Sequence, residues 1–257
     1  GMISIITPTY NSGAYLEKCI QSIVNQEFDD YEHIIVDGGS TDNTLAIIKK
    51  YESLYNIKWI SEKDNGMYDA ISKGFKMAKG DILCWLNSDD VYMPWTLKVV
   101  EHVFQNTDID WCTGVPTQIN ENGEMYFPIK TFVTYPQFCI RKGWMDGQRL
   151  CCIQQESTFW RKSLYDQVDG IDTDYKLAGD YALWVKFSNR TKLHTVNSVL
   201  AGFRVHEGQK SENRLAYCNE AHRLTGVEKM INKLKIYKII NRILKEKEQV
   251  IDIRTLE

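Results

Sequence analysis

Apolar and polar positions follow two different rhythms along the first hundred residues. Short apolar runs rich in β-branched residues predict buried strands. They lie at residues 3–8, 33–39, 57–62 and 81–87. Between them, apolar residues recur every three or four positions, which predicts amphipathic helices near Leu16, Leu45 and Met67, with another opening near Pro94. Strands that alternate with helices indicate parallel βαβ units, covered by helices on both faces.

The second half of the chain has a different pattern. From Trp111 the alternation breaks, and the next twenty residues predict two strands around an Asn-Glu-Asn-Gly turn. Residues 131–150 are rich in aromatic side chains, including Trp144. Two interpretations of these aromatics stay open: a hydrophobic core or loop, or a platform on which an acceptor sugar packs. A strand-like run covers 195–203, and the chain after Glu212 is expected to be helical to near its end.

Composition describes an ordinary soluble globular protein. Of 257 residues, 43% are hydrophobic and 25% are charged, and the net charge of −3 gives no electrostatic reason to expect nucleic acid binding. The seven cysteines are scattered and odd in number, which favours core residues in a reducing compartment. No signal peptide precedes the first strand, and no apolar run approaches the roughly 18 residues that span a bilayer. A cytoplasmic location is therefore expected.

Each of the four predicted strands ends in polar or acidic residues. These ends are residues 7–11, 37–40, 62–66 and 87–90. Ligands bind at the carboxyl ends of parallel strands, so four such loops together predict a binding site. Turn formation is the alternative for any one loop, and helix capping is the alternative for Ser40 and Thr41.

The acidic residues of these loops indicate the kind of ligand. Neither a G-x-x-x-x-G-K-[ST] loop nor a G-x-G-x-x-G loop is present, so the backbone cradles that commonly bind phosphate are missing. Carboxylates alone would repel a phosphate, but a divalent cation between them would remove this repulsion. Asp89 and Asp90 offer the hard oxygen ligands that Mg²⁺ or Mn²⁺ prefers. Asp37 and Asp64 would then accept hydrogen bonds from a base or a ribose. A nucleotide diphosphate held through a metal uses all four loops.

Four motifs in order resemble the family 2 glycosyltransferases with the GT-A fold. They are TPTYN (7–11), VDGGSTDNT (36–44), DNGMYDAISKGFKMAKGD (64–81) and WLNSDD (85–90). The resemblance covers roughly residues 2–212. It implies a Rossmann-like, mostly parallel sheet flanked by helices, with a smaller acceptor-side subdomain and C-terminal helices. It also implies a uridine or thymidine diphosphate sugar as donor, and inversion at the anomeric carbon.

The resemblance also implies which residues bind the donor. Those of the first three motifs are Pro8, Thr9, Tyr10, Asn11, Asp37 and Asp64. Lys73 would face the diphosphate, with a solvated helix lysine as the alternative. Asn87 stands where the family often has the first Asp of a D-x-D motif, and with Ser88 it would contact the donor. The Mn²⁺ or Mg²⁺ would then depend on Asp89, with Asp90 either behind that ligand, without direct contact to the ion, or as an alternate ligand.

In the second half, Gly179-Asp180 stands where the family carries its catalytic base. Asp180 would accept the proton of the acceptor hydroxyl, and helix capping is the alternative reading of the same residue. Glu156, beside Gln154 and Gln155, and Trp144 are expected to contact the acceptor. His206 and Lys210 fit a loop that folds over the donor diphosphate, with an ordinary surface loop as the alternative.

These expectations divide the chain into a nucleotide-sugar-binding half (2–110), an acceptor and base half (111–212) and a C-terminal helical extension (213–257). The predicted function is transfer of a sugar to a hydroxyl of a saccharide or lipid-linked acceptor, in surface polysaccharide assembly. Two alternatives stay open: an inactive nucleotide-sugar-binding protein, because of Asn87, and a nucleotidyltransferase acting on a sugar phosphate. The basic C-terminal helices would either lie on the inner face of an anionic membrane or pack on the domain with a solvated basic face.

Overall fold

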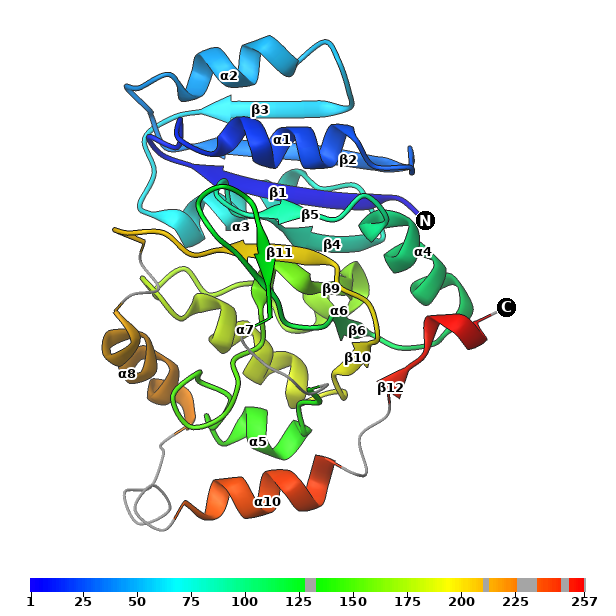
Figure 1. Ribbon diagram of the computed structural model, residues 1–257. Helices are drawn as coiled ribbons and strands as arrows, with labels where there is room; N and C mark the ends of the chain where they lie inside the picture. The colour runs from blue at the N-terminus through cyan, green and yellow to red at the C-terminus, as the bar shows by residue number, and fades with distance from the viewer. Residues whose placement is uncertain (128–132, 210–212, 226–234, 246–249, 257) are drawn as a thin grey trace.

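The computed structural model describes residues 1–127, 133–209, 213–225, 235–245 and 250–256. Its centre is a sheet of eight strands in the order β12-β10-β6-β9-β4-β1-β2-β3 (Figure 1). The strands of the first half are β1 (Ile3–Thr9), β2 (Tyr31–Asp37), β3 (Ile57–Ser61) and β4 (Ile82–Trp85). Those of the second half are β6 (Trp111–Thr113), β9 (Thr158–Arg161), β10 (His194–Val196) and β12 (Val250–Ile251). Only β9 runs antiparallel to its neighbours, so the predicted, mostly parallel α/β architecture is confirmed.

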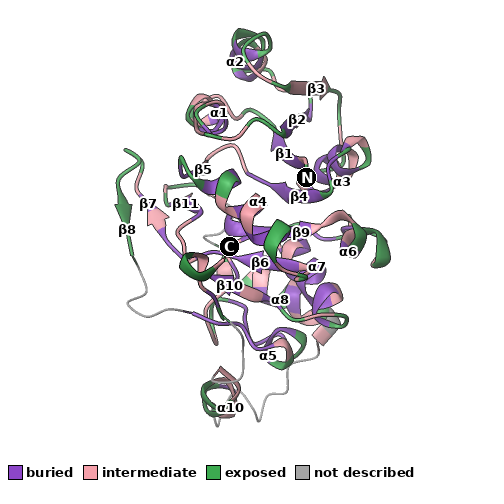
Figure 2. Ribbon diagram, turned by 90° about the vertical axis from the view of Figure 1, so that its right-hand side faces the viewer, coloured by how far each residue is buried: buried purple, intermediate pink, exposed green. Residues whose placement is uncertain are grey.

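Helices cover both faces of this sheet, because consecutive residues of a strand point to opposite sides. Ile5 of β1 lies in the apolar cluster with residues of α1 (Leu16–Val24) and α4 (Thr96–Asn106). Ile6 lies in the opposite cluster with residues of α3 (Met67–Met77) and α7 (Gly179–Ser188). Figure 2 shows β1, β2 and β4 buried between these layers, whereas the edge strand β3 is only partly buried. The remaining helices are α2 (Thr44–Tyr51), α5 (Gln137–Arg141), α6 (Lys162–Gln167), α8 (Arg214–Thr225) and α10 (Ile236–Lys245).

A cluster of tryptophans joins the two halves of the chain under α7. The ring of Trp184 stacks on Trp85 at 6.0 Å and on Trp111 at 5.6 Å, and Trp160 meets its edge at 5.6 Å. α7 is buried on almost every side, which holds its first turn in place at the end of β4. Trp144 is 2% exposed in the same core. This burial corrects the acceptor contact predicted for Trp144 and supports the core interpretation.

A small second sheet lies beside the first, in the order β5-β11-β7-β8. Its strands are β5 (Val91–Tyr92), β7 (Gln118–Ile119), β8 (Met125–Tyr126) and β11 (Ala201–Arg204). β7 and β8 form the hairpin predicted around the Asn-Glu-Asn-Gly turn. The run at 195–203 was expected as one strand and is two, because the chain leaves the central sheet after β10 and enters the small sheet at β11.

The C-terminal segment is helical in part. α8 and α10 agree with the prediction, but residues 250–255 form β12 and a 3₁₀ turn (Ile253–Thr255), so the expectation of helix to near the end is wrong there. β12 pairs with β10 at the edge of the central sheet, and Asn197 donates a hydrogen bond to Asp252 over 2.9 Å. Within the described residues, no helix has the length and apolar character needed to cross a bilayer.

Candidate active site

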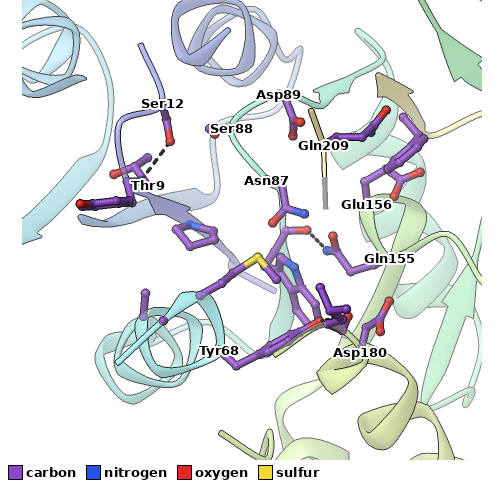
Figure 3. A pocket seen from close by; sticks show the side chains of 18 of the residues that line it. Thr9, Ser12, Tyr68, Asn87, Ser88, Asp89, Gln155, Glu156, Asp180 and Gln209 are labelled. Carbon is purple, nitrogen blue, oxygen red and sulfur yellow. Dashed lines mark hydrogen bonds between the residues drawn. The ribbon is translucent and has the colours of Figure 1, made fainter. Parts of the chain in front are cut away.

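A cavity of about 980 Å³ opens at the carboxyl ends of β1 and β4 (Figure 3). Its walls come from both halves of the chain: the loops after β1, β3 and β4, the first turns of α3, α7 and α8, and the loop after β11. Eleven of the predicted site residues line it: Pro8, Thr9, Tyr10, Asn11, Asp64, Asn87, Ser88, Asp89, Glu156, Asp180 and His206. Gln154 and Gln155 line it as well. The volume lies at the upper end of the roughly 300–1,000 Å³ usual for ligand pockets.

The loop after β1 is tied to the loop after β2. Asn11 has φ of 47°, a left-handed conformation that Asn tolerates better than most residues. Its side-chain oxygen accepts hydrogen bonds from the amides of Thr41 at 2.8 Å and Asp42 at 3.3 Å. Tyr10 is left with its ring two-thirds exposed at the cavity mouth. The loop after β1 is therefore fixed by hydrogen bonds, and it exposes the aromatic ring of Tyr10 to the cavity.

Asp37 does not line the cavity. It is fully buried and accepts five hydrogen bonds, from the hydroxyls of Thr9, Ser40 and Ser61 and from the amides of Gly39 and Ser40. Burial raises its pKa, but these hydrogen bonds outweigh burial and hold the pKa below its usual value. The donor contact predicted for Asp37 is corrected to a positioning role, since its carboxylate joins three strand ends.

Two other predicted donor contacts also change. Lys73 does not line the cavity, because its ammonium pairs with Glu62 at 3.2 Å and with Asp69 at 3.3 Å. Its predicted contact with the diphosphate is therefore corrected to that of a partly buried helix lysine held in ion pairs. Lys210 lies outside the described residues.

The two aspartates of the acidic motif point in different directions. Asp89 lines the cavity, and its Oδ2 lies 2.8 Å from Nε2 of His206. Asp90 is buried: Oδ1 accepts the Arg204 amide at 3.0 Å, while Oδ2 has no hydrogen-bond partner among the described residues. Burial, and then the charges of Asp89 and Glu156, raise the pKa of Asp90 well above its usual range. Of the two roles expected for Asp90, its buried position agrees with a place behind Asp89 rather than with an alternate direct ligand.

Arg204 is a residue of this motif that sequence reasoning missed. Its guanidinium donates to the carbonyl oxygen of Asp89 at 2.8 Å and lies 4.5 Å from the centre of the Tyr15 ring. Its Nη1 also donates to the carbonyl oxygens of Asn120 and Glu121. Arg204 therefore ties β11 and the β7–β8 turn to the acidic motif, and it brings His206, two residues later, to Asp89.

The residues present fit a divalent cation in part. No group of three or more His, Cys, Asp or Glu side chains arranged for a metal occurs in the described part of the chain. Asp89 and His206 provide one oxygen and one nitrogen on the cavity wall, and the unpartnered Oδ2 of Asp90 lies behind them. Mg²⁺ and Mn²⁺ commonly complete their coordination with water and substrate phosphates, so two protein ligands beside an open cavity are compatible with either ion.

Asp180 lies on the opposite side of the cavity, in the first turn of α7 (Figure 3). Its Oδ1 accepts hydrogen bonds from the amide of Tyr181 at 2.7 Å and the hydroxyl of Tyr217 at 2.9 Å. Burial raises the pKa of Asp180 to about 6, against the lowering effect of those two donors and of Arg214. The cap position of α7 is Ala178, so Asp180 is not the capping residue.

The position of Asp180 is set by a contact between α3 and α7. The hydroxyl of Tyr68 donates to the carbonyl oxygen of Leu177 at 2.8 Å. A Cβ at Gly179 would lie 2.7 Å from the Tyr68 ring, so only glycine fits there. Tyr68 and Tyr217 were not among the predicted site residues. Tyr68 lies inside a motif that carried the family resemblance, whereas nothing in the local sequence around Tyr217 marks it.

Glu156 is the most enclosed carboxyl group that lines the cavity. It is 3% exposed in the 3₁₀ turn Gln155–Ser157, and its Oε1 has no hydrogen-bond partner among the described residues. Burial raises its pKa to about 8, and the charges of Asp180 and Asp89 add to the shift. The side chains on both sides of it are anchored, since Gln155 donates to the carbonyl oxygen of Trp85 and Gln154 accepts the Thr117 amide.

Comparison with known proteins identifies the family. The model of "Glycosyl transferase family 2" matches residues 4–167. An uncharacterized glycosyltransferase of Rickettsia typhi is 27% identical over 93% of this chain and 75% of its own length. The hyaluronan synthase of Pasteurella multocida is 25% identical over 86% of this chain but only 22% of its own length. The matched part of this chain thus corresponds to about a fifth of that synthase.

Solved structures show the same fold. The Staphylococcus aureus protein TarS, crystallised with UDP-GlcNAc, superposes with a TM-score of 0.66 at 22% identity, over 83% of this chain and 61% of that one. At this identity the likeness concerns the fold alone. The family match over residues 4–167 agrees with the motifs at the strand ends and with the cavity that they line. The chain belongs to glycosyl transferase family 2.

Proposed function

We propose that the protein is an inverting glycosyltransferase that moves a sugar from a uridine or thymidine diphosphate donor to a hydroxyl of a saccharide or lipid-linked saccharide. One observation carries the proposal: the Asp89–His206 pair and the Asp180 carboxylate face a single cavity from opposite sides. In a single in-line displacement, the leaving diphosphate and the general base must lie on opposite sides of the sugar. The Asp89–His206 pair would lie on the diphosphate side and Asp180 on the side of the base.

The nucleoside would lie against the loops of the first half. Tyr10 offers an exposed ring for stacking on the base, and Asp64 and Asn87 line the same cavity. Carboxylate and amide oxygens accept hydrogen bonds from ribose hydroxyls and from base N–H groups. The neutral Asn87 supplies such contacts without adding a third negative charge beside the diphosphate.

The diphosphate would lie beside Asp89 and His206, which would hold Mn²⁺ or Mg²⁺. When bound, such an ion neutralises the charge that develops on the departing diphosphate. Arg204 holds the backbone of Asp89, so that the carboxylate faces the cavity while Asp90 stays buried behind it.

Asp180 would remove the proton of the acceptor hydroxyl. Oδ1 is held by Tyr181 and Tyr217, and Oδ2 has no hydrogen bond in the described structure, so one oxygen is oriented and the other is available. A pKa of about 6 leaves the group ionised at neutral pH and close enough to that pH to accept a proton. The acceptor oxygen then bonds to the anomeric carbon as the bond from that carbon to the diphosphate breaks.

The donor and product classes in this proposal are supported by the named relatives. TarS is crystallised with UDP-GlcNAc, and the Pasteurella protein is named a hyaluronan synthase. A uridine diphosphate sugar and a role in polysaccharide assembly are therefore the first candidates. Nucleotidyl transfer is disfavoured because the loop after β1 carries no basic residue, and an inactive binding protein would have no need of the oriented Asp180.

The experiment is calorimetric titration of the purified protein with uridine, thymidine, guanosine and adenosine diphosphates, each with and without Mn²⁺. The expected result is Mn²⁺-dependent binding of the uridine or thymidine compound. His206→Ala should weaken the Mn²⁺ dependence, and Lys73→Ala serves as the control outside the cavity. Failure of all four nucleotides to bind, with and without Mn²⁺, would refute the donor site.

We also propose that α10 rests on an anionic membrane surface. Tyr237, Ile240 and Leu244 pack on the core, while the adjoining Ile239 and Ile243 are more than half exposed. Lys235, Lys238, Arg242 and Lys245 accompany them, with no acidic residue between 235 and 245. An apolar stripe flanked by basic side chains suits the interface of an anionic bilayer, on which a lipid-linked acceptor would also lie.

A further inference from the structure

Glu156 has an unmet hydrogen-bonding requirement inside the cavity. The residue is only 3% exposed, and its buried Oε1 has no hydrogen-bond partner in the described part of the chain. A buried polar atom without a partner is destabilising, and native proteins contain few of them. Gln154 and Gln155 are both anchored to backbone groups, so the turn holds Glu156 toward the cavity rather than letting it rotate outward.

The location of Glu156 limits what its partner is. The charges of Asp180 and Asp89 both act on it, so it lies within electrostatic reach of the two. Figure 3 shows it on the wall between them, with Asp89 above and Asp180 below. Under the proposed function, the diphosphate leaves on the Asp89 side and the acceptor arrives on the Asp180 side. The group between those two points is the transferred sugar.

We propose that Glu156 determines donor specificity by hydrogen-bonding a ring hydroxyl of the transferred sugar. This inference rests on the proposed function, and it moves Glu156 from the acceptor contact expected from the sequence to the donor. A protonated carboxyl donates through its O–H and accepts through its other oxygen, and a sugar hydroxyl also does both. One hydroxyl at this place would therefore supply the partner that Oε1 lacks.

A carboxyl in this setting favours neutral sugars. Burial raises the pKa of Glu156 and so favours its protonated form, which suits a hydroxyl partner. A sugar carboxylate would add a further negative charge beside Asp89 and Asp180. A deoxy sugar lacking the hydroxyl would leave the buried carboxyl unpaired, and sites built to hydrogen-bond a hydroxyl discriminate strongly against such analogues.

The test compares UDP with UDP-sugars, because UDP lacks the group that Glu156 is proposed to bind. Calorimetry in Mn²⁺ would measure Kd for UDP, UDP-glucose, UDP-galactose, UDP-GlcNAc and UDP-glucuronic acid, in the wild type, Glu156→Gln and Glu156→Leu. In Glu156→Leu, we expect unchanged UDP affinity and a loss of at least about tenfold for the preferred UDP-sugar. Glu156→Gln, whose amide also donates and accepts, should lose less and should alter the order of preference among the sugars.

The matched control is Gln154→Leu. Gln154 lines the cavity in the adjacent position, but its side-chain oxygen is already bonded to Thr117. The Gln154→Leu variant should leave the ratio of UDP affinity to UDP-sugar affinity unchanged. An unchanged ratio in Glu156→Leu, or an effect confined to the KM of the acceptor, would overturn the inference while the proposed function stood. Failure of the wild type to bind any of the four nucleoside diphosphates would overturn both.

Discussion

Asp37 and Asp64 follow neighbouring strands, yet they have different surroundings. Asp37 is buried under five hydrogen bonds, whereas Asp64 lines the cavity and accepts one hydrogen bond from the Gly66 amide at 3.0 Å. Removing Asp37 leaves the buried hydroxyl of Thr9 and several part-buried donors without a partner, which costs free energy. Removing Asp64 exposes its partner to a water-filled site.

We therefore expect Asp37→Ala to lower the free energy of unfolding by about 2–4 kcal/mol, and Asp64→Ala to lower it by less than about 1 kcal/mol. Urea denaturation followed by circular dichroism measures both. Asp64→Ala should instead weaken nucleotide binding. Equal stability losses in the two variants would contradict the positioning role of Asp37.

Asp180 gives the reaction a pH dependence of known sign. The carboxyl must be ionised to accept a proton, and its pKa is raised to about 6, chiefly by burial. The transfer rate should therefore be constant above about pH 7 and decline as the pH falls through 6. Initial rates at saturating donor and acceptor, measured from pH 5 to 8.5, would give this profile.

Asp180→Asn removes the base while keeping the shape of the side chain. Transfer should fall by about 10²–10⁴, and affinity for the nucleoside diphosphate should be unchanged. The residual rate should also lose its decline below pH 6. Undiminished turnover in this variant would exclude Asp180 as the base.

Sequence patterns located most of these residues but not their orientation. Asp89 and Asp90 are adjacent and chemically identical, and the motif alone does not distinguish them. Asp90 turns inward because it accepts the amide of Arg204, which is 114 positions away in the chain. Tyr217, on α8, orients Asp180 from 37 positions away. Contacts of this range follow from the tertiary fold and leave no local pattern.

At the scale of elements, α3 and α7 meet at one point beside the site. Tyr68 of α3 lies under Gly179 of α7, where a Cβ would be 2.7 Å from the ring. Gly179→Ala would force the two helices apart, and overpacking of this kind typically costs about 1–3 kcal/mol.

We expect Gly179→Ala to reduce transfer at least about tenfold by displacing Asp180, with much smaller effects on nucleotide binding. Thermal unfolding and initial rates would be measured together. Tyr68→Phe, which keeps the ring and loses only the hydrogen bond to Leu177, is the matched control. A second substitution, Tyr68→Leu, should recover part of the stability lost in Gly179→Ala. Wild-type rates in Gly179→Ala would refute the positioning argument.

The elements of the first half were predictable because each strand and helix there has its own periodic pattern. β1 to β4 and α1 to α3 lie where the apolar runs and stripes indicated. The errors concern very short strands. The two residues of β12, and the break between β10 and β11, depend on which neighbour each segment pairs with. Two-residue segments carry too little periodicity to indicate such pairing.

At the scale of the whole molecule, charge is distributed unevenly. The chain carries a net charge of −3, yet α10 and the residue before it contain four basic and no acidic side chains. Ile239 and Ile243 lie on the exposed part of this helix. A second copy of the same basic surface would be repelled, whereas an anionic bilayer would be attracted.

We therefore expect the protein to sediment with phosphatidylglycerol vesicles at low salt and to be released at high salt. Ile239→Asn/Ile243→Asn should reduce the bound fraction several-fold without changing nucleotide binding. The control is Leu54→Asn/Met125→Asn, which removes exposed apolar residues elsewhere on the surface. Equal binding of both double variants, or equal binding to pure phosphatidylcholine, would refute membrane contact through α10.

The contact between Tyr68 and Gly179 has a consequence for building new enzymes from this one. The nucleotide loops belong to the first half of the chain, and the base belongs to the second, but a single aromatic ring sets the distance between them. An acceptor half grafted from another transferase should work with this donor half only if it has glycine at the position of Gly179, facing the Tyr68 ring. Chimeras that keep this contact would have the base at the correct distance from the donor. Chimeras that lose it would bind the donor but would not transfer its sugar.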